Sequence, residues 1–151
     1  MPSKTPTDST NLTRSERVTL ANDLRISCMR ISRRVRYESD NELASHQFSA
    51  LIRLEHGPRT NSEIAEIEKV SAPSMCRTTQ GLVNRGLVSR ADDPTDRRQV
   101  ILSLTPEGRK TISRVRKHRD EWMLERLRGL SDDERDLLHR ASAVLAKVAG
   151  E

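Results

Sequence analysis

Aromatic side chains are nearly absent, because the chain of 151 residues has one Trp, one Tyr and one Phe. Only 34% of the residues are hydrophobic and 32% are charged, which leaves little material for the core of a free-standing monomer. Long amphipathic helices that bury an apolar stripe against a second subunit would make up for this shortage. The composition therefore predicts a single domain that completes its core by association.

Long apolar runs are also missing. No stretch approaches the ~20 residues that span a bilayer, and Met1–Asn11 contains no hydrophobic segment that could act as a signal peptide. We therefore expect a cytoplasmic protein with no membrane partner. Two cysteines are present and are expected to be free thiols in that compartment. Cys28 lies on an apolar helical stripe, which predicts a buried position.

Motifs of enzymes and of metal sites are not found. The chain has no glycine-rich phosphate loop, no G-x-S-x-G elbow and no plausible Cys/His nucleophile pair. Its histidines have no close ligand spacing such as H-x-x-x-H; they are His46, His56, His118 and His139. We therefore expect neither an enzyme nor a metal or cofactor site.

Positive charge, by contrast, is concentrated in one part of the chain. The net charge is +5, and residues 71–119 alone hold 11 Lys/Arg against 4 Asp/Glu. A basic block of this kind is typical of nucleic-acid binding, although a solvated basic face is the alternative. The motifs within the block decide between the two.

Apolar spacing and capping signals divide the chain into helices and one hairpin. Residues 1–12 are polar without periodicity and are predicted to be a disordered tail. Thr13, Thr60 and Ser131 each precede a Glu by three residues, which is the spacing of a capping box at a helix start. Helices are predicted over about 13–38, 45–55, 60–70, 71–85, 106–128 and 131–149, and strands over Leu87–Arg90 and Gln99–Leu104.

Two short helices followed by a hairpin make a winged helix-turn-helix, over about residues 45–105. The second helix of such a pair fits the major groove of DNA, with its first residues at the base edges. In this position Arg77 could grip guanine O6/N7 and Gln80 could pair with adenine N6/N7. Lys69 stands where many such turns have Gly, which predicts a turn that is strained or differently shaped. The predicted DNA-binding residues of the helix are Ser71, Pro73, Ser74, Cys76, Arg77, Gln80 and Asn84; the alternative is an ordinary solvated helix face.

The tip of the hairpin carries the same kind of signal. Arg97 and Arg98 follow Asp96 in a turn, and an extended hairpin can place an Arg in a narrow A·T-rich minor groove. A neighbouring carboxylate, of Asp93 or Asp96, could hold that guanidinium in position by a bidentate pair. The alternative is a loop that balanced charges keep soluble.

The segment LVSRADDPTDRRQVILSLTPEGRK resembles the wing signature of the MarR (multiple-antibiotic-resistance regulator) family, with a DP-x-D-x-R turn, an alternating strand and L-T-x-x-G opening a long helix. The preceding SAPSMCRTTQGLVNRGLV is similar to the recognition helix of that family. The resemblance covers the chain from about Thr13 onwards. It implies a mainly α fold with a small β-hairpin, in which Arg77 contacts bases, Asp96 and Arg98 pair at the wing tip, and long terminal helices build a homodimer.

Residues 13–151 are thus expected to form one MarR-like domain, with dimerisation helices at about 13–38 and 106–149. The expected function is a transcription regulator, commonly a repressor, that binds a pseudo-palindromic operator on double-stranded DNA. A small-molecule effector or oxidation of Cys76 would release it; the alternative for Cys76, and the interpretation that the sequence favours, is an ordinary residue in a serine-like position without a redox role. The few aromatics argue against an effector held by stacked rings. The alternatives are a low-specificity architectural DNA protein and a module that binds an acidic protein partner.

Overall fold

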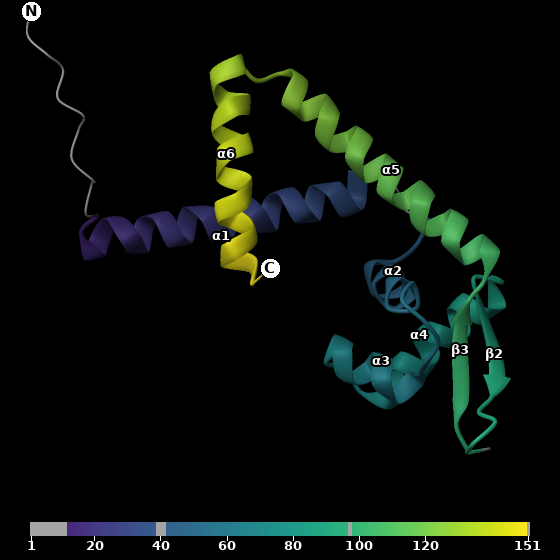
Figure 1. Cartoon of the computed structure of the whole chain (residues 1–151). Coiled ribbons are helices and arrows are strands. Elements are labelled where there is room, and N and C mark those ends of the chain that lie inside the picture. The colour runs from purple at the N-terminus through teal and green to yellow at the C-terminus, as the bar shows by residue number, and fades with distance from the viewer. Residues whose placement is uncertain (1–11, 39–41, 97, 151) are drawn as a thin grey trace, which may run out of the picture. The chain divides into compact units, whose positions relative to one another are not determined.

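The computed structural model describes residues 12–38, 42–96 and 98–150. The chain divides into two compact units, Met1–Arg34 and Val35–Glu151. The elements are α1 (Arg14–Glu38), α2 (Ser45–Ile52), β1 (Arg59–Thr60), α3 (Asn61–Glu68), α4 (Ala72–Asn84), β2 (Val88–Asp92), β3 (Val100–Leu104), α5 (Pro106–Arg128) and α6 (Asp132–Ala149). Figure 1 labels all of them except the short β1. Residues 1–11 of the predicted tail lie outside the described residues.

The first unit holds most of α1. The predicted capping box opens it, because the backbone N–H of Thr13 donates to Glu16 (2.8 Å) and the backbone N–H of Glu16 donates to the Thr13 hydroxyl (3.3 Å). No residue of α1 is buried. The predicted burial of Cys28 is therefore wrong for the single chain, where this thiol is exposed because none of the described residues of the unit covers the stripe.

The core lies in the second unit, between α2, α3, α4, the small sheet and the first half of α5. Its fully buried side chains include Leu51, Ile64, Leu82, Leu102 and Ile112. The sheet is antiparallel with strand order β1-β3-β2. The predicted hairpin is formed by β2 and β3, and β1 adds a third strand that the sequence analysis missed. Two residues are too few to show the alternation by which strands are predicted.

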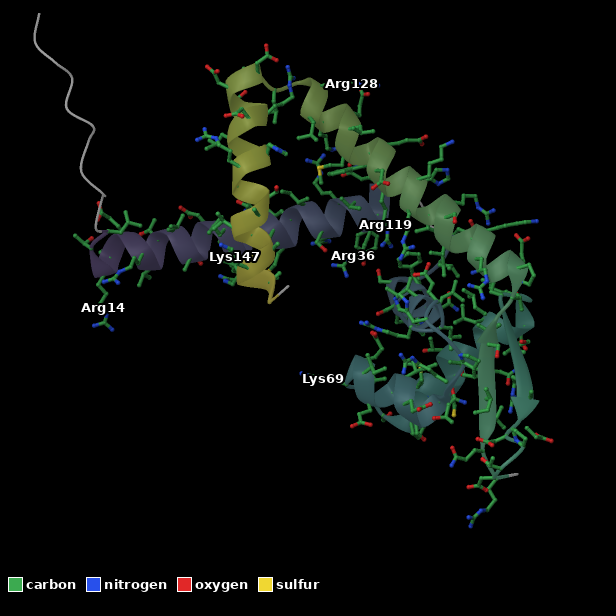
Figure 2. All side chains as sticks on the ribbon, in the orientation of Figure 1. Arg14, Arg36, Lys69, Arg119, Arg128 and Lys147 are labelled. Atoms are coloured by element: carbon green, nitrogen blue, oxygen red, sulfur yellow. The ribbon has the colours of Figure 1, made fainter. Side chains whose placement is uncertain are left out.

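The turn between α3 and α4 depends on one residue with unusual backbone geometry. Lys69 ends α3 with φ 53° and ψ 44°, the left-handed conformation that costs about 1 kcal/mol outside glycine. The strain predicted at this position is therefore present. Figure 2 labels Lys69 at the end of α3.

The long helix α5 starts at the sheet and is fastened to the core along its first half. The Arg114 guanidinium donates two hydrogen bonds to the carboxylate of Glu42 (2.8 and 2.6 Å), and Arg116 donates two to Glu55 (2.8 and 2.7 Å). Arg119, labelled in Figure 2, places its guanidinium 4.2 Å from the centre of the Phe48 ring. These contacts join α5 to α2 and to the residues on either side of it.

The last helix, α6, is capped as predicted and has no buried residue. The backbone N–H of Ser131 donates to Glu134 (2.8 Å), and the backbone N–H of Glu134 donates to the Ser131 hydroxyl (3.3 Å). One face of α6 is apolar and exposed in the single chain: Leu137, Leu138, Val144, Leu145 and Val148. The fold is thus mainly helical with a small antiparallel sheet, as predicted. None of the described helices combines the length and apolarity that crossing a membrane requires.

Candidate nucleic-acid interface

Helix α4, the predicted recognition helix, has one buried and one exposed face. Ser71 caps its start, where the hydroxyl accepts a hydrogen bond from the backbone N–H of Ser74 (3.4 Å). Met75 and Leu82 are buried on the inner face together with Thr79. The Thr79 hydroxyl donates to the side chain of Asn61 on α3 (2.6 Å), so a polar residue is accommodated in the core and joins the two helices.

The outer face of α4 carries the residues that the sequence analysis selected. Pro73, Arg77, Gln80 and Asn84 follow one another at spacings of four, three and four, so they lie on one side of the helix. All seven predicted positions are exposed: Ser71, Pro73, Ser74, Cys76, Arg77, Gln80 and Asn84. The helix therefore presents a continuous polar face opposite its buried one.

The wing extends from this helix as a regular hairpin. Residues Val88 to Asp92 pair with Leu104 to Val100, and the backbone N–H of Asp93 donates to the carbonyl of Gln99 (3.1 Å) where the strands end. The side chain of Asp93 accepts from the backbone N–H and the hydroxyl of Thr95, both at 2.7 Å. These hydrogen bonds shape a turn at the outer end of the hairpin.

The Asp96 carboxylate positions Arg98 at the wing tip. It accepts from the backbone N–H of Arg98 (3.1 Å) and from its Nε (3.2 Å), while the Arg98 side chain stays 92% exposed. These two hydrogen bonds, with a third from the Gln99 amide, hold the pKa of Asp96 below its usual value, so Asp96 stays ionised at neutral pH. The structure thus contains the ion pair that was expected here, and Arg97 lies outside the described residues.

The structure adds one residue that the sequence analysis missed. Arg90, on β2, donates from Nη1 to the side-chain oxygen of Gln80 (2.9 Å), and the Gln80 amide nitrogen donates to the side chain of Asn84 (2.8 Å). Alternation along β2 puts Arg90 on the same face as the buried Val88, which is the face turned to α4. This alternation can be recognised in the sequence, but it does not identify Gln80 as the partner of Arg90.

The first turn of α5 lies very close to the wing at Gly108. The backbone N–H of Thr105 donates to the carbonyl of Leu87 (3.1 Å), and the Thr105 hydroxyl donates to the carbonyl of Gly86 (2.7 Å). A Cβ at position 108 would lie 2.2 Å from the Leu87 carbonyl oxygen and 2.7 Å from a methyl group of Leu104. This explains why the L-T-x-x-G pattern needs glycine at its end, and it ties the wing to the long helix.

A cavity of about 310 Å³ opens beside the recognition helix. It is lined by His46, Glu68, Val70, Ser74, Met75, Arg77 and Thr78. Glu68 receives hydrogen bonds from Ser49 and Arg53; burial raises the pKa of Glu68, but these bonds outweigh it and the pKa lies below its usual value. Within residues 12–38, 42–96 and 98–150, no three potential metal ligands gather into a site.

Comparisons with known proteins agree on the family. The MarR family profile matches residues 43–100. An HTH-type transcriptional regulator of Mycobacterium tuberculosis is 37% identical over 134 residues, which are 87% of this chain and 94% of the relative.

Solved structures show the same fold. A MarR family protein of Bacillus stearothermophilus aligns with a TM-score of 0.74 at 22% identity, over 93% of this chain and 99% of that one. A variant of S. aureus MepR, solved bound to an oligodeoxyribonucleotide, aligns with a TM-score of 0.64 at 19% identity, over 87% of this chain and 96% of that one. The close relative and the family profile together establish that this chain belongs to the MarR family of transcription regulators.

Proposed function

We propose that the chain is a homodimeric repressor that binds a pseudo-palindromic DNA operator through α4 and the wing. The observation that carries the proposal is the combination, in one compact unit, of a continuous polar face on α4 and an exposed Arg98 that Asp96 holds at the wing tip. The relative solved with an oligodeoxyribonucleotide has the same fold, which supports this use of the surface.

Each half of the surface suits a different groove of DNA. A helix fits the major groove, and an Arg near its N-terminus can donate two hydrogen bonds to guanine O6 and N7. Arg77 is exposed in the first half of α4 and takes this role. Arg98 takes the minor-groove role, because a narrow A·T-rich groove concentrates negative potential and attracts a guanidinium.

The apolar face of α6 supports the dimer. Two recognition helices must lie about 34–36 Å apart to meet successive major grooves, which one chain of this size does not provide. Leu137 is 57% exposed and Val144 is 59% exposed in the single chain, and both lie on the apolar face of α6. Covering such side chains with a second copy would contribute about 1.5–3 kcal/mol for each residue fully buried.

Loss of Arg77 should weaken operator binding by roughly 1–3 kcal/mol, about 5- to 150-fold, and relax base choice at one position of each half-site. The measurement is fluorescence-anisotropy titration of wild type and Arg77→Ala on the operator and on an unrelated duplex. Arg109→Ala is the control, since it removes one exposed positive charge on α5 and should bind like wild type. Equal operator affinity of Arg77→Ala and Arg109→Ala contradicts the assignment of Arg77.

The same surface offers two routes by which the protein would be released from DNA. A small effector in the 310 Å³ cavity would contact Arg77 and bias its position. Oxidation of the exposed Cys76 would add bulk and polarity on α4. If the thiol route operates, peroxide releases wild type from the operator and leaves Cys76→Ser bound; release of both proteins to the same extent removes Cys76 from the mechanism.

An architectural DNA-binding role is the second candidate, and the net charge of +7 on residues 71–119 favours it. Binding would then come mainly from phosphate contacts. Such binding falls steeply with salt and discriminates little between sequences. The anisotropy titrations separate the two roles, because only an operator-binding protein retains a preference for one duplex as salt rises.

A further inference from the structure

The chain of hydrogen bonds from Arg90 through Gln80 to Asn84 fixes how the Gln80 amide is oriented. A guanidinium has donors only, so the atom of Gln80 that faces Arg90 at 2.9 Å is the carbonyl oxygen. The amide nitrogen then faces the side-chain oxygen of Asn84 at 2.8 Å, where it donates. Both ends of the amide therefore have protein partners and one defined orientation.

This orientation disfavours pairing to adenine, because Arg90 already uses one of the two lone pairs of the Gln80 oxygen. A glutamine that reads adenine accepts from N6 with its oxygen and donates to N7 with its nitrogen. In this protein the oxygen of Gln80 already accepts from Arg90. The remaining N–H groups can donate to a ligand. They belong to the amides of Gln80 and Asn84 and to the guanidinium of Arg90. A surface with donors in excess is complementary to guanine, which presents two acceptors, O6 and N7, in the major groove.

The elements that carry these side chains hold the arrangement in place. Gln80 and Asn84 are one turn apart on α4, so their side chains are neighbours on one face. Arg90 lies within the ladder of β2 and β3, opposite Leu102, which is 1% exposed. Arg90 thus projects from a strand whose register is fixed by the core.

We propose that Arg90 is a positioning residue that determines base preference. By holding the Gln80 oxygen, Arg90 makes the protein select guanine rather than adenine as the base that faces Gln80. The inference rests on the proposed operator binding and replaces the adenine contact that was expected for Gln80. Through Arg90, strand β2 of the wing therefore determines part of the base sequence that α4 recognises.

Selection of binding sites from a random duplex pool tests this with four proteins: wild type, Arg90→Met, Gln80→Ala and Arg109→Met. Methionine keeps the length and apolar stem of Arg90 and removes its donors. Gln80→Ala identifies the column that Gln80 reads, because that column alone loses its preference. We expect guanine there for wild type and a shift of the guanine-to-adenine ratio toward adenine by roughly 5- to 100-fold for Arg90→Met. Arg109→Met controls for the lost charge and should select the wild-type motif.

The outcomes separate the inference from the proposed function. If wild type enriches no motif, operator binding itself is overturned, and the inference with it. A wild-type motif with adenine in the Gln80 column overturns the inference alone. So does an Arg90→Met variant that binds more weakly but keeps guanine in that column, since Arg90 would then act only on the DNA backbone or on stability.

Discussion

Replacing Gly108 by alanine is expected to lower the free energy of unfolding by about 3 kcal/mol. The added methyl group would lie 2.2 Å from the carbonyl oxygen of Leu87, and that oxygen accepts a hydrogen bond from the Thr105 backbone. Relief therefore requires the first turn of α5 to move away from the wing. Alanine is favoured over glycine inside a helix by only about 1 kcal/mol, so the clash decides the sign.

Gly129→Ala is the matched control for this prediction. Gly129 follows α5 with φ −75°, and a Cβ there would meet its nearest neighbour, the carbonyl oxygen of Arg126, at an ordinary 3.6 Å. We expect this variant to be as stable as wild type or slightly more stable. Urea unfolding of the three proteins makes the comparison, and equal midpoints for the two variants would show that the approach of α5 to the wing is not tight.

The double variant Leu137→Asp, Val144→Asp is expected to weaken the dimer by more than about 100-fold, because each of the two chains would bury two carboxylates in the interface. Both side chains are more than half exposed in the single chain, so the fold of the chain itself should tolerate the change. Analytical ultracentrifugation over a range of concentrations measures the dimer, and circular dichroism verifies the fold. Operator affinity should fall together with the dimer, since one recognition helix would be left to bind alone.

The control for the dimer prediction is the double variant His139→Asp, Ala143→Asp. It adds the same two charges to α6 but on the side opposite the apolar face, where both residues are exposed. This protein should remain dimeric. Dissociation of both double variants would indicate a general charge effect, and a dimer that survives in both would place the interface elsewhere.

Features set by local chemistry could be predicted from the sequence. The capping boxes at Thr13, Thr60 and Ser131 form as predicted, because each depends on residues three positions apart. Gly86 takes the left-handed conformation that is common for a glycine just after a helix, with φ 71°. The geometry of Lys69 was predicted in the same way, from a single position in a turn.

Features that depend on tertiary contacts could not be predicted. The sequence shows Gln80 on an exposed face, but only the packing of β2 against α4 brings Arg90 to it. The buried Thr79 hydroxyl is accommodated because its partner Asn61 lies on another helix, a contact that the sequence does not reveal. Burial of Cys28 was predicted from the periodic apolar stripe of its helix. Periodicity does not reveal whether the surface that covers such a stripe belongs to the same chain.

The most direct test of the central claim is the selection of wild-type binding sites from a random duplex pool at about physiological salt, with the mass of the bound protein measured in parallel. A dimeric operator-binding protein should enrich an inverted repeat with half-sites about 10 base pairs apart, bound by two copies of the chain. Binding that enriches no motif and is lost as salt rises would contradict sequence-specific recognition. In that case α4 and the wing would contact only the DNA backbone.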